Sequence, residues 1–178
     1  ATAMITPFTA EGKVNFEAFG RMIEYQIENG TDALVVLGTT GEPATMTEEE
    51  KKDVMRFSKE RGLQLLVLCN GDMAAEKFIR TQLACGDPAT HPVMIHAQLL
   101  GVDQLDDLKR AGILPSFFVA HVLYWGDVHV KNFGFERASA ISPLCSALKK
   151  GIRFTLHQDA PVVSPDMLET IWCAAERR

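Results

Sequence analysis

Three histidines and an aspartate that could bind a metal stand at the ends of apolar runs, where the chain enters a turn. They are His96, His121, His157 and Asp159. Imidazole and carboxylate groups are common zinc ligands, and a catalytic zinc usually has three protein ligands beside an open position. We take His96 and Asp159 as the ligand candidates, which His121 and His157 could join to bind adventitious zinc. The alternative is that these residues are polar groups hydrogen-bonded near strand ends.

The elements that would position these residues alternate along the chain. Apolar runs without strict alternation are typical of strands buried in a parallel sheet, and each is followed by apolar positions at helical spacing. Thr47 and Glu50 form a capping box, and the segment 124–136 is expected to be a loop over one end of the sheet. The expected strands are 2–8, 33–38, 63–69, 92–97, 113–120 and 153–157, and the expected helices are 15–30, 47–61, 72–83, 102–111, 142–151 and 164 to near 178.

This alternation predicts about six βα units in a single α/β domain over residues 1–178. Strands that alternate with helices imply a parallel sheet with right-handed crossovers. A complete eight-unit barrel typically needs about 250 residues, and the chain has 178. We therefore expect a parallel β/α-barrel that is small or incomplete, with an open doubly wound parallel sheet as the alternative. If the sheet stays open, its exposed edges should favour a homodimer.

The composition excludes several classes of function. The chain is 47% hydrophobic and 23% charged, with a net charge of -5 and both signs interspersed, so neither a nucleic-acid-binding surface nor a membrane-binding surface is indicated. No apolar run approaches the roughly 20 residues of a membrane span, and no signal peptide is expected. The four cysteines lie far apart without a C-x-x-C pair, as in a cytoplasmic chain with reduced thiols.

The segments TAMITPFT, FGRMIEYQIENGTDALVVLGTTGE and ATMTEEEKK resemble dihydrodipicolinate synthase, of the N-acetylneuraminate lyase family. The resemblance covers residues 1–60. It implies that Thr39 and Thr40 follow the second barrel strand, bind a substrate carboxylate and relay protons through a tyrosine. Hydroxyls and backbone amides at a strand-to-helix turn suit an anion. The family also needs a Schiff-base lysine on a later strand, but the lysines beyond residue 60 fall on helix or loop patterns, and the tyrosine motif is absent.

From residue 63 to residue 178 the resemblance changes. The segments QLLVLCNGDMAAEKF, HPVMIHAQLL, PSFFVAHVLYWGDVH and FTLHQDAPVVSPD are similar to the closing half of metal-dependent amidohydrolases of the N-substituted formamide deformylase type. The resemblance implies that His96 is a metal ligand on the sixth barrel strand, and that Asp159 is the ligand and proton shuttle of the last strand. Leu68 stands where the fifth-strand histidine is expected, and the chain contains no H-x-H.

The two resemblances together predict an engineered or recombined chimera of two barrel-enzyme fragments, 1–62 and 63–178. Since each fragment lacks part of its family's reactive groups, we expect no native catalytic function, no catalytic residues and no cofactor beyond adventitious zinc. The alternatives are a metal-dependent amidohydrolase with a depleted site and a lyase remnant that binds a small 2-oxo acid.

The junction near Arg61 and Gly62 has a consequence for packing. The apolar residues Val54, Met55 and Phe57 of the first fragment would pack against strands of the second. Mismatches in a core are unfavourable, so we expect imperfect packing at this junction.

Overall fold

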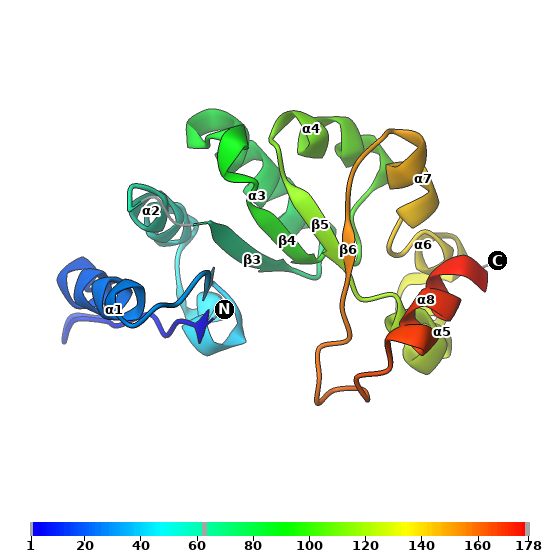
Figure 1. Ribbon diagram of the computed structural model, residues 1–178, viewed down its shortest axis with the longest axis horizontal. Helices are drawn as coiled ribbons and strands as arrows, with labels where there is room; N and C mark the ends of the chain where they lie inside the picture. The colour runs from blue at the N-terminus through cyan, green and yellow to red at the C-terminus, as the bar shows by residue number, and fades with distance from the viewer. Residues whose placement is uncertain (1, 62–63, 177–178) are drawn as a thin grey trace.

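The computed structural model describes residues 2–61 and 64–176. Its centre is one sheet of six parallel strands, which lie in the sheet in the order of the chain (Figure 1). The expected strands are all found, though each is shorter than the apolar run that predicted it, and Leu63 lies outside the described residues. The strands are β1 (Thr2–Ala3), β2 (Leu34–Val36), β3 (Leu65–Cys69), β4 (Val93–His96), β5 (Leu114–Phe117) and β6 (Thr155–Leu156).

Helices connect consecutive strands. The α-helices of the described residues are α1 (Phe16–Glu28), α2 (Glu48–Lys59), α3 (Asp72–Cys85), α4 (Leu105–Arg110), α5 (Ala120–Phe133), α6 (Phe135–Ser139), α7 (Leu144–Lys149) and α8 (Met167–Glu176). Short 3-10 helices are η1 (Thr39–Gly41), η2 (Pro43–Thr45), η3 (Pro88–Thr90) and η4 (Val102–Gln104).

The strand order decides between the two predicted architectures. A doubly wound sheet reverses its strand order at a switch point, whereas every pair of neighbours here is consecutive in the chain. Within the described residues, β1 and β6 each pair with one strand, so the sheet is open. The incomplete β/α-barrel is thus confirmed, and the doubly wound alternative is wrong.

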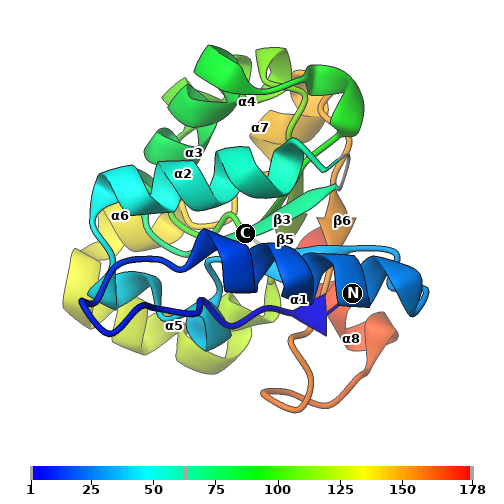
Figure 2. The ribbon, with the colours of Figure 1, turned by 90° about the vertical axis from the view of Figure 1, so that its left-hand side faces the viewer.

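The helices lie on the outer side of the curved sheet. In Figure 1, α1, α2, α3, α4 and α7 follow the sheet from left to right along its outer side, and Figure 2 shows α1 and α2 side by side at one end. The strand residues of the main core are buried together with apolar side chains of these helices. These strand residues are Leu34, Val36, Leu65, Val67, Cys69, Met94 and Phe117.

The opposite face of the sheet is apolar as well, but it is only half-buried. Alternate residues of a strand point to opposite faces, and the alternate positions of β2, β3 and β4 are Val35, Leu66, Leu68, Val93 and Ile95. In a closed barrel this face would fill the interior. The open sheet therefore leaves part of an interior surface in contact with solvent.

Local sequence explains where the first two helices begin. The Oδ1 atom of Asn15 accepts a hydrogen bond from the backbone N–H of Ala18 at 3.0 Å, as expected of a helix cap. The predicted capping box is confirmed, because Thr47 N–H donates to Glu50 Oε2 at 2.8 Å and Glu50 N–H donates to Thr47 Oγ1 at 3.3 Å.

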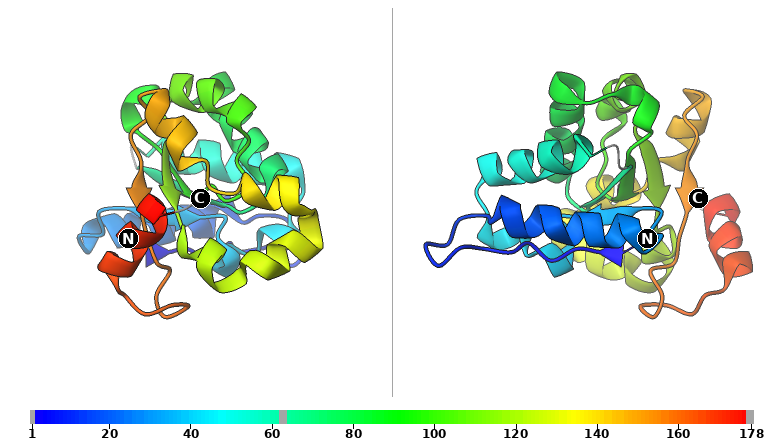
Figure 3. Two further views of the ribbon diagram at one scale, coloured as in Figure 1. Left: turned by 90° about the vertical axis from the view of Figure 1, so that its right-hand side faces the viewer. Right: turned by 60° about the vertical axis from the view of Figure 1, so that its left-hand side comes forward.

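Two expectations about the second half of the chain are wrong. The segment 124–136 is mainly helical instead of a loop, and Trp125, with φ of -131°, marks a kink inside α5. The aromatic and glycine residues suggested a loop, but packing of α5 against α8 accounts for the helix (Figure 3). The helix expected to begin at residue 142 begins two residues later as α7, because Ser142 has a φ of 51° and Pro143 takes the cap position.

None of the helices within residues 2–61 and 64–176 combines the length and the apolar character needed to cross a bilayer.

Candidate functional site

The candidate site lies where β4, β5 and β6 end, because the carboxyl ends of parallel strands meet at one edge of a sheet. His96 is the last residue of β4 and is buried. Its φ of 69°, and that of 45° for Ala97, place two consecutive non-glycine residues in the left-handed region. Such backbone strain persists where the surrounding structure holds it, and it is concentrated at functional sites.

The end of β6 brings the two other predicted residues close to His96. The backbone N–H of His157 donates to the carbonyl oxygen of Phe117 at 3.1 Å, which places the imidazole beside β5. Asp159 follows two residues later, with a φ of 54°, and its side chain is 47% exposed. The two ligand candidates lie close together, with His96 Nε2 3.9 Å from Asp159 Oδ2.

His121 reaches the same place from a helix, and the expectation that it ends a strand is wrong. The chain leaves β5 at Phe117 and begins α5 at Ala120, so His121 lies in the first turn of that helix. Its ring centroid is 6.2 Å from that of His96 and 4.6 Å from that of Phe118. The ring of His157 is 5.0 Å from that of His96. The result is a cluster of three imidazoles with Asp159 at its exposed side, which we call the histidine cluster.

Few of the buried polar atoms in the histidine cluster are hydrogen-bonded. Ser116 Oγ lies 2.9 Å from His157 Nδ1, and Gln98 Nε2 lies 3.3 Å from Nε2 of His129. Within the described residues, His96 Nδ1, His121 Nδ1 and His157 Nε2 are buried without a hydrogen-bond partner. A buried polar atom without a partner is unfavourable for folding. Such atoms are rare in native structures, so several of them together call for a structural or functional explanation.

Burial keeps the three imidazoles neutral. It lowers the pKa of His121 and of His157 to about 4, and the neighbouring histidines act in the same direction. Burial also lowers the pKa of His96, although the negative charge of Asp159 opposes the change. At neutral pH the cluster is therefore a set of uncharged nitrogens that can accept a proton or a metal but do not attract an anion.

The residues present do not fit a catalytic metal centre. Within residues 2–61 and 64–176, no group of three or more His, Cys, Asp or Glu side chains has an arrangement that could hold a metal ion. His96 and Asp159 contact each other, while Leu68, near the end of β3, is apolar and half-buried. No metal-dependent step is assigned to the histidine cluster for this reason.

Thr39 and Thr40 lie elsewhere along the same edge of the sheet. Both belong to η1 after β2 and are exposed, and β3 separates β2 from β4. The Thr39 carbonyl oxygen accepts a hydrogen bond from Glu42 N–H at 3.1 Å, which closes the turn. The structure therefore does not join the residual anion-binding candidates to the histidine cluster.

Sequence reasoning missed a row of aromatic side chains beside the cluster. The row is spaced at intervals of four residues along α5 and consists of His121, Trp125, His129 and Phe133. The ring centroids of His121 and Trp125 are 4.8 Å apart, and those of His129 and Phe133 are 5.8 Å apart. This spacing is itself a helical signal. It could have identified both α5 and the contribution of His129.

The sequence comparisons match enzymes of one family. The sequence profile of the dihydrodipicolinate synthetase family matches residues 1–62. The 4-hydroxy-tetrahydrodipicolinate synthase of Parabacteroides distasonis is 57% identical over 53 residues, which are 30% of this chain and 18% of that protein. The same enzyme of Aquifex aeolicus is 39% identical over 104 residues, 57% of this chain and 31% of that protein. A match of that length necessarily includes residues beyond 62.

The fold of the whole chain is similar to another class of protein. An uncharacterized metal-dependent hydrolase from Pyrococcus furiosus matches 100% of this chain and 34% of its own length, with a TM-score of 0.66 and 20% sequence identity. At that identity the likeness concerns the fold. The chain spans between about a fifth and about a third of the length of these relatives. Each of these proteins is therefore matched over only a part of its own length.

Proposed function

We propose that this chain is a non-catalytic α/β scaffold, engineered or recombined from pieces of two barrel enzymes, which keeps their packing surfaces without a complete reactive site. Two observations support an origin from two enzymes. The profile of the synthase family matches residues 1–62, and the fold of the whole chain is similar to that of a hydrolase. A barrel enzyme takes its reactive groups from the ends of several strands. When partial sets of strands are joined, neighbouring strands keep their packing more readily than reactive side chains from several strands keep their mutual arrangement.

The observation that carries the proposal is the distribution of polar groups along the strand ends. Thr39 and Thr40 follow β2, His96 ends β4, and the half-buried Leu68 lies near the end of β3 between them. The groups of the lyase type and those of the hydrolase type are thus separated by an apolar residue. Neither set is brought together with the partners that its chemistry needs.

The lysines argue against Schiff-base chemistry. A nucleophilic lysine needs a sheltered position where its pKa is lowered. Beyond residue 64 the lysines lie on the outer helices or directly after one of them: Lys77 on α3, Lys109 on α4, Lys131 on α5, Lys149 on α7 and Lys150 next to it. Borohydride treatment in the presence of pyruvate should accordingly give no covalent adduct by mass spectrometry.

Turnover assays test the proposal directly. We expect no hydrolysis of N-formyl amides, with or without added zinc, and no condensation of pyruvate with an aldehyde, above the rate in buffer. Turnover that is lost in Asp159→Asn or in Thr40→Val would overturn the proposal. A labelled lysine in the borohydride experiment would overturn it in favour of the lyase.

A metal-dependent hydrolase with a depleted site is the second candidate. It is favoured by the unpartnered ring nitrogens of His96, His121 and His157. Metal analysis of protein purified without added zinc separates the two candidates. The scaffold should contain well under one equivalent, whereas one full equivalent that disappears in His96→Ala would favour the hydrolase.

A further inference from the structure

A groove lies between α2 and α3, where the first fragment meets the second. It has a volume of ≈ 270 Å³ and crosses β3, and we call it the seam groove. Its apolar lining includes Leu37, Met55, Val67 and Phe78. The groove occupies the junction at which the sequence predicts imperfect packing.

The floor of the seam groove is apolar and belongs to the core. Met55 of α2 and Phe78 of α3 are buried, and so are Leu37 and Val67 beneath them. All four belong to the main core of the protein. An alkyl chain lying on this floor would be stabilised by the removal of its methylene groups from water.

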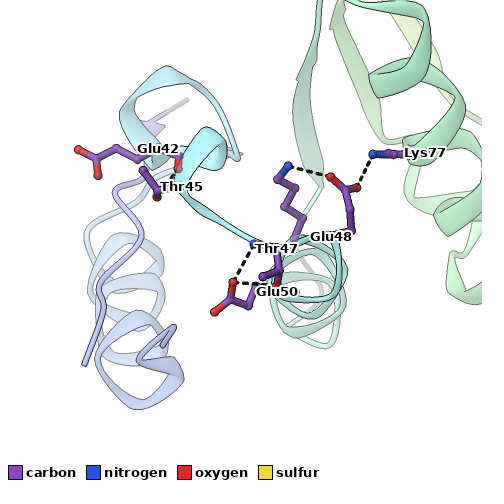
Figure 4. Close-up of polar contacts among 7 residues, drawn as sticks. Glu42, Thr45, Thr47, Glu48, Glu50 and Lys77 are labelled. Carbon is purple, nitrogen blue, oxygen red and sulfur yellow. Dashed lines mark hydrogen bonds and ion pairs between the residues drawn. The ribbon is translucent and has the colours of Figure 1, made fainter. Parts of the chain in front are cut away.

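The rim is polar and mostly cationic. Lys51 and Lys77 both contact Glu48, with Nζ–Oε distances of 3.0 and 2.8 Å (Figure 4). Lys52 contacts Glu49, which is not part of the lining, at 2.7 Å. The rim thus carries three ammonium groups against two carboxylates. Because Glu48 is shared between two lysines, one positive charge is left without a counterpart.

We propose that the seam groove binds a small amphipathic anion, a medium-chain alkyl carboxylate, with its alkyl chain on the floor and its carboxylate against the lysines of the rim. Charge complementarity selects this ligand, since a neutral alkyl chain would contact the apolar floor but would not neutralise the excess positive charge of the rim. A short carboxylate would neutralise that charge but would not cover the apolar floor. The proposal does not depend on the proposed function, because none of the groove's lining residues belongs to the histidine cluster.

Octanoate is the probe, titrated into the full chain by isothermal calorimetry, with octanol and butyrate as matched comparisons. We expect saturable binding of one octanoate with a dissociation constant below about 1 mM, and clearly weaker binding of the other two. Equal binding of octanol would show that the rim contributes nothing and would overturn the proposal. Absence of saturable octanoate binding would do the same.

Two variants locate the bound octanoate. Thr81 is half-buried, and Thr81→Met extends a side chain over the floor, so it should weaken octanoate binding at least about tenfold. Lys77→Gln should weaken binding about threefold, as expected of a partly exposed charge. Lys131→Gln and Phe135→Ser are controls on exposed surface far along the chain, and both should leave binding unchanged. Each variant is first checked for native circular dichroism. Octanoate affinity that is unaffected by Thr81→Met and Lys77→Gln, or is lost in Phe135→Ser, would overturn the proposal.

Discussion

His96 Nε2 lies 3.9 Å from Asp159 Oδ2, although β5 lies between β4, which ends at His96, and β6, which precedes Asp159. The distance is longer than a hydrogen bond. The side chain of His96 is 5% exposed and that of Asp159 is 47% exposed, so the imidazole is buried while the carboxylate faces solvent. Burial therefore determines the charge of the imidazole, and the histidine cluster stays neutral despite a nearby acid.

Neutral buried imidazoles predict a loss of stability in mild acid. Burial lowers the pKa of His121 and His157 to about 4, below the value of about 6.5 in the unfolded chain. Between these values the unfolded state binds more protons than the folded state, so the free energy of unfolding falls as the pH falls from about 6.5 towards 4. For His157 alone we expect a loss of roughly 2 kcal/mol between pH 7 and pH 5, measured by urea denaturation at both pH values.

His157→Gln is the variant that tests this dependence, because an amide can replace the contact with Ser116 without titrating. It should reduce the loss between pH 7 and pH 5. His91→Asn, on an exposed turn with a φ of 46°, is the matched control and should leave the loss unchanged. An equal pH dependence in the original chain and in His157→Gln would contradict the prediction.

The regular elements could be predicted where local physics determines them. The capping box at Thr47, the cap at Asn15 and the apolar runs of β3 and β4 need only short-range hydrogen bonds or burial on a sheet, and all are present. The helix α5 could not be predicted in the same way. Its hydrophobic side is completed by α8, more than thirty residues further along the chain, and its glycine and aromatic residues suggested a loop.

The candidate site shows the same limit. The approach of His96 to Asp159 follows from parallel strands ending at one edge, so spacing and strand order were sufficient to expect it. The position of His121 depends on a sharp turn from β5 into α5, which no local pattern indicated. The seam groove depends on how α2 and α3 are separated, a tertiary property that the sequence indicated only as imperfect packing.

Filling the seam groove should stabilise the fold. Thr81 is half-buried at the groove, and methionine there would extend over the apolar lining to which Met55 and Phe78 belong. We expect Thr81→Met to raise the free energy of unfolding by about 0.5–1 kcal/mol more than Thr81→Ala, because alanine gains helix propensity without filling the space. Urea denaturation measures the difference. Equal stabilities of the two variants would mean that the groove is already closed in solution.

The ion pair between Glu48 and Lys77 joins the two fragments but should contribute little to stability. Both side chains are 47% exposed, and water and salt weaken such pairs. A double-mutant cycle with Glu48→Gln and Lys77→Gln should give a coupling smaller than the effect of Thr81→Met, and salt should reduce it further. The Glu49–Lys52 pair within α2 is the matched comparison. A coupling that persists in high salt would show that the pair is desolvated and important for joining the fragments.

An open sheet predicts a homodimer, and the structure indicates which edge to test. β1 presents a row of backbone groups with β2 on one side only, and Ala3 at its end is exposed. Strand edges of this kind can pair with another chain, and an inserted lysine prevents such pairing. We expect sedimentation velocity over about a hundredfold range of concentration to show a monomer–dimer equilibrium. Ala3→Lys should shift it to monomer, while Ala10→Lys, on a nearby exposed turn, should not.

Because β1 and β6 are only two residues long, edge pairing competes with association through the half-buried apolar face of the sheet. A dimer that survives Ala3→Lys would assign the contact to that face or to β6, and a monomer at every concentration would contradict the prediction.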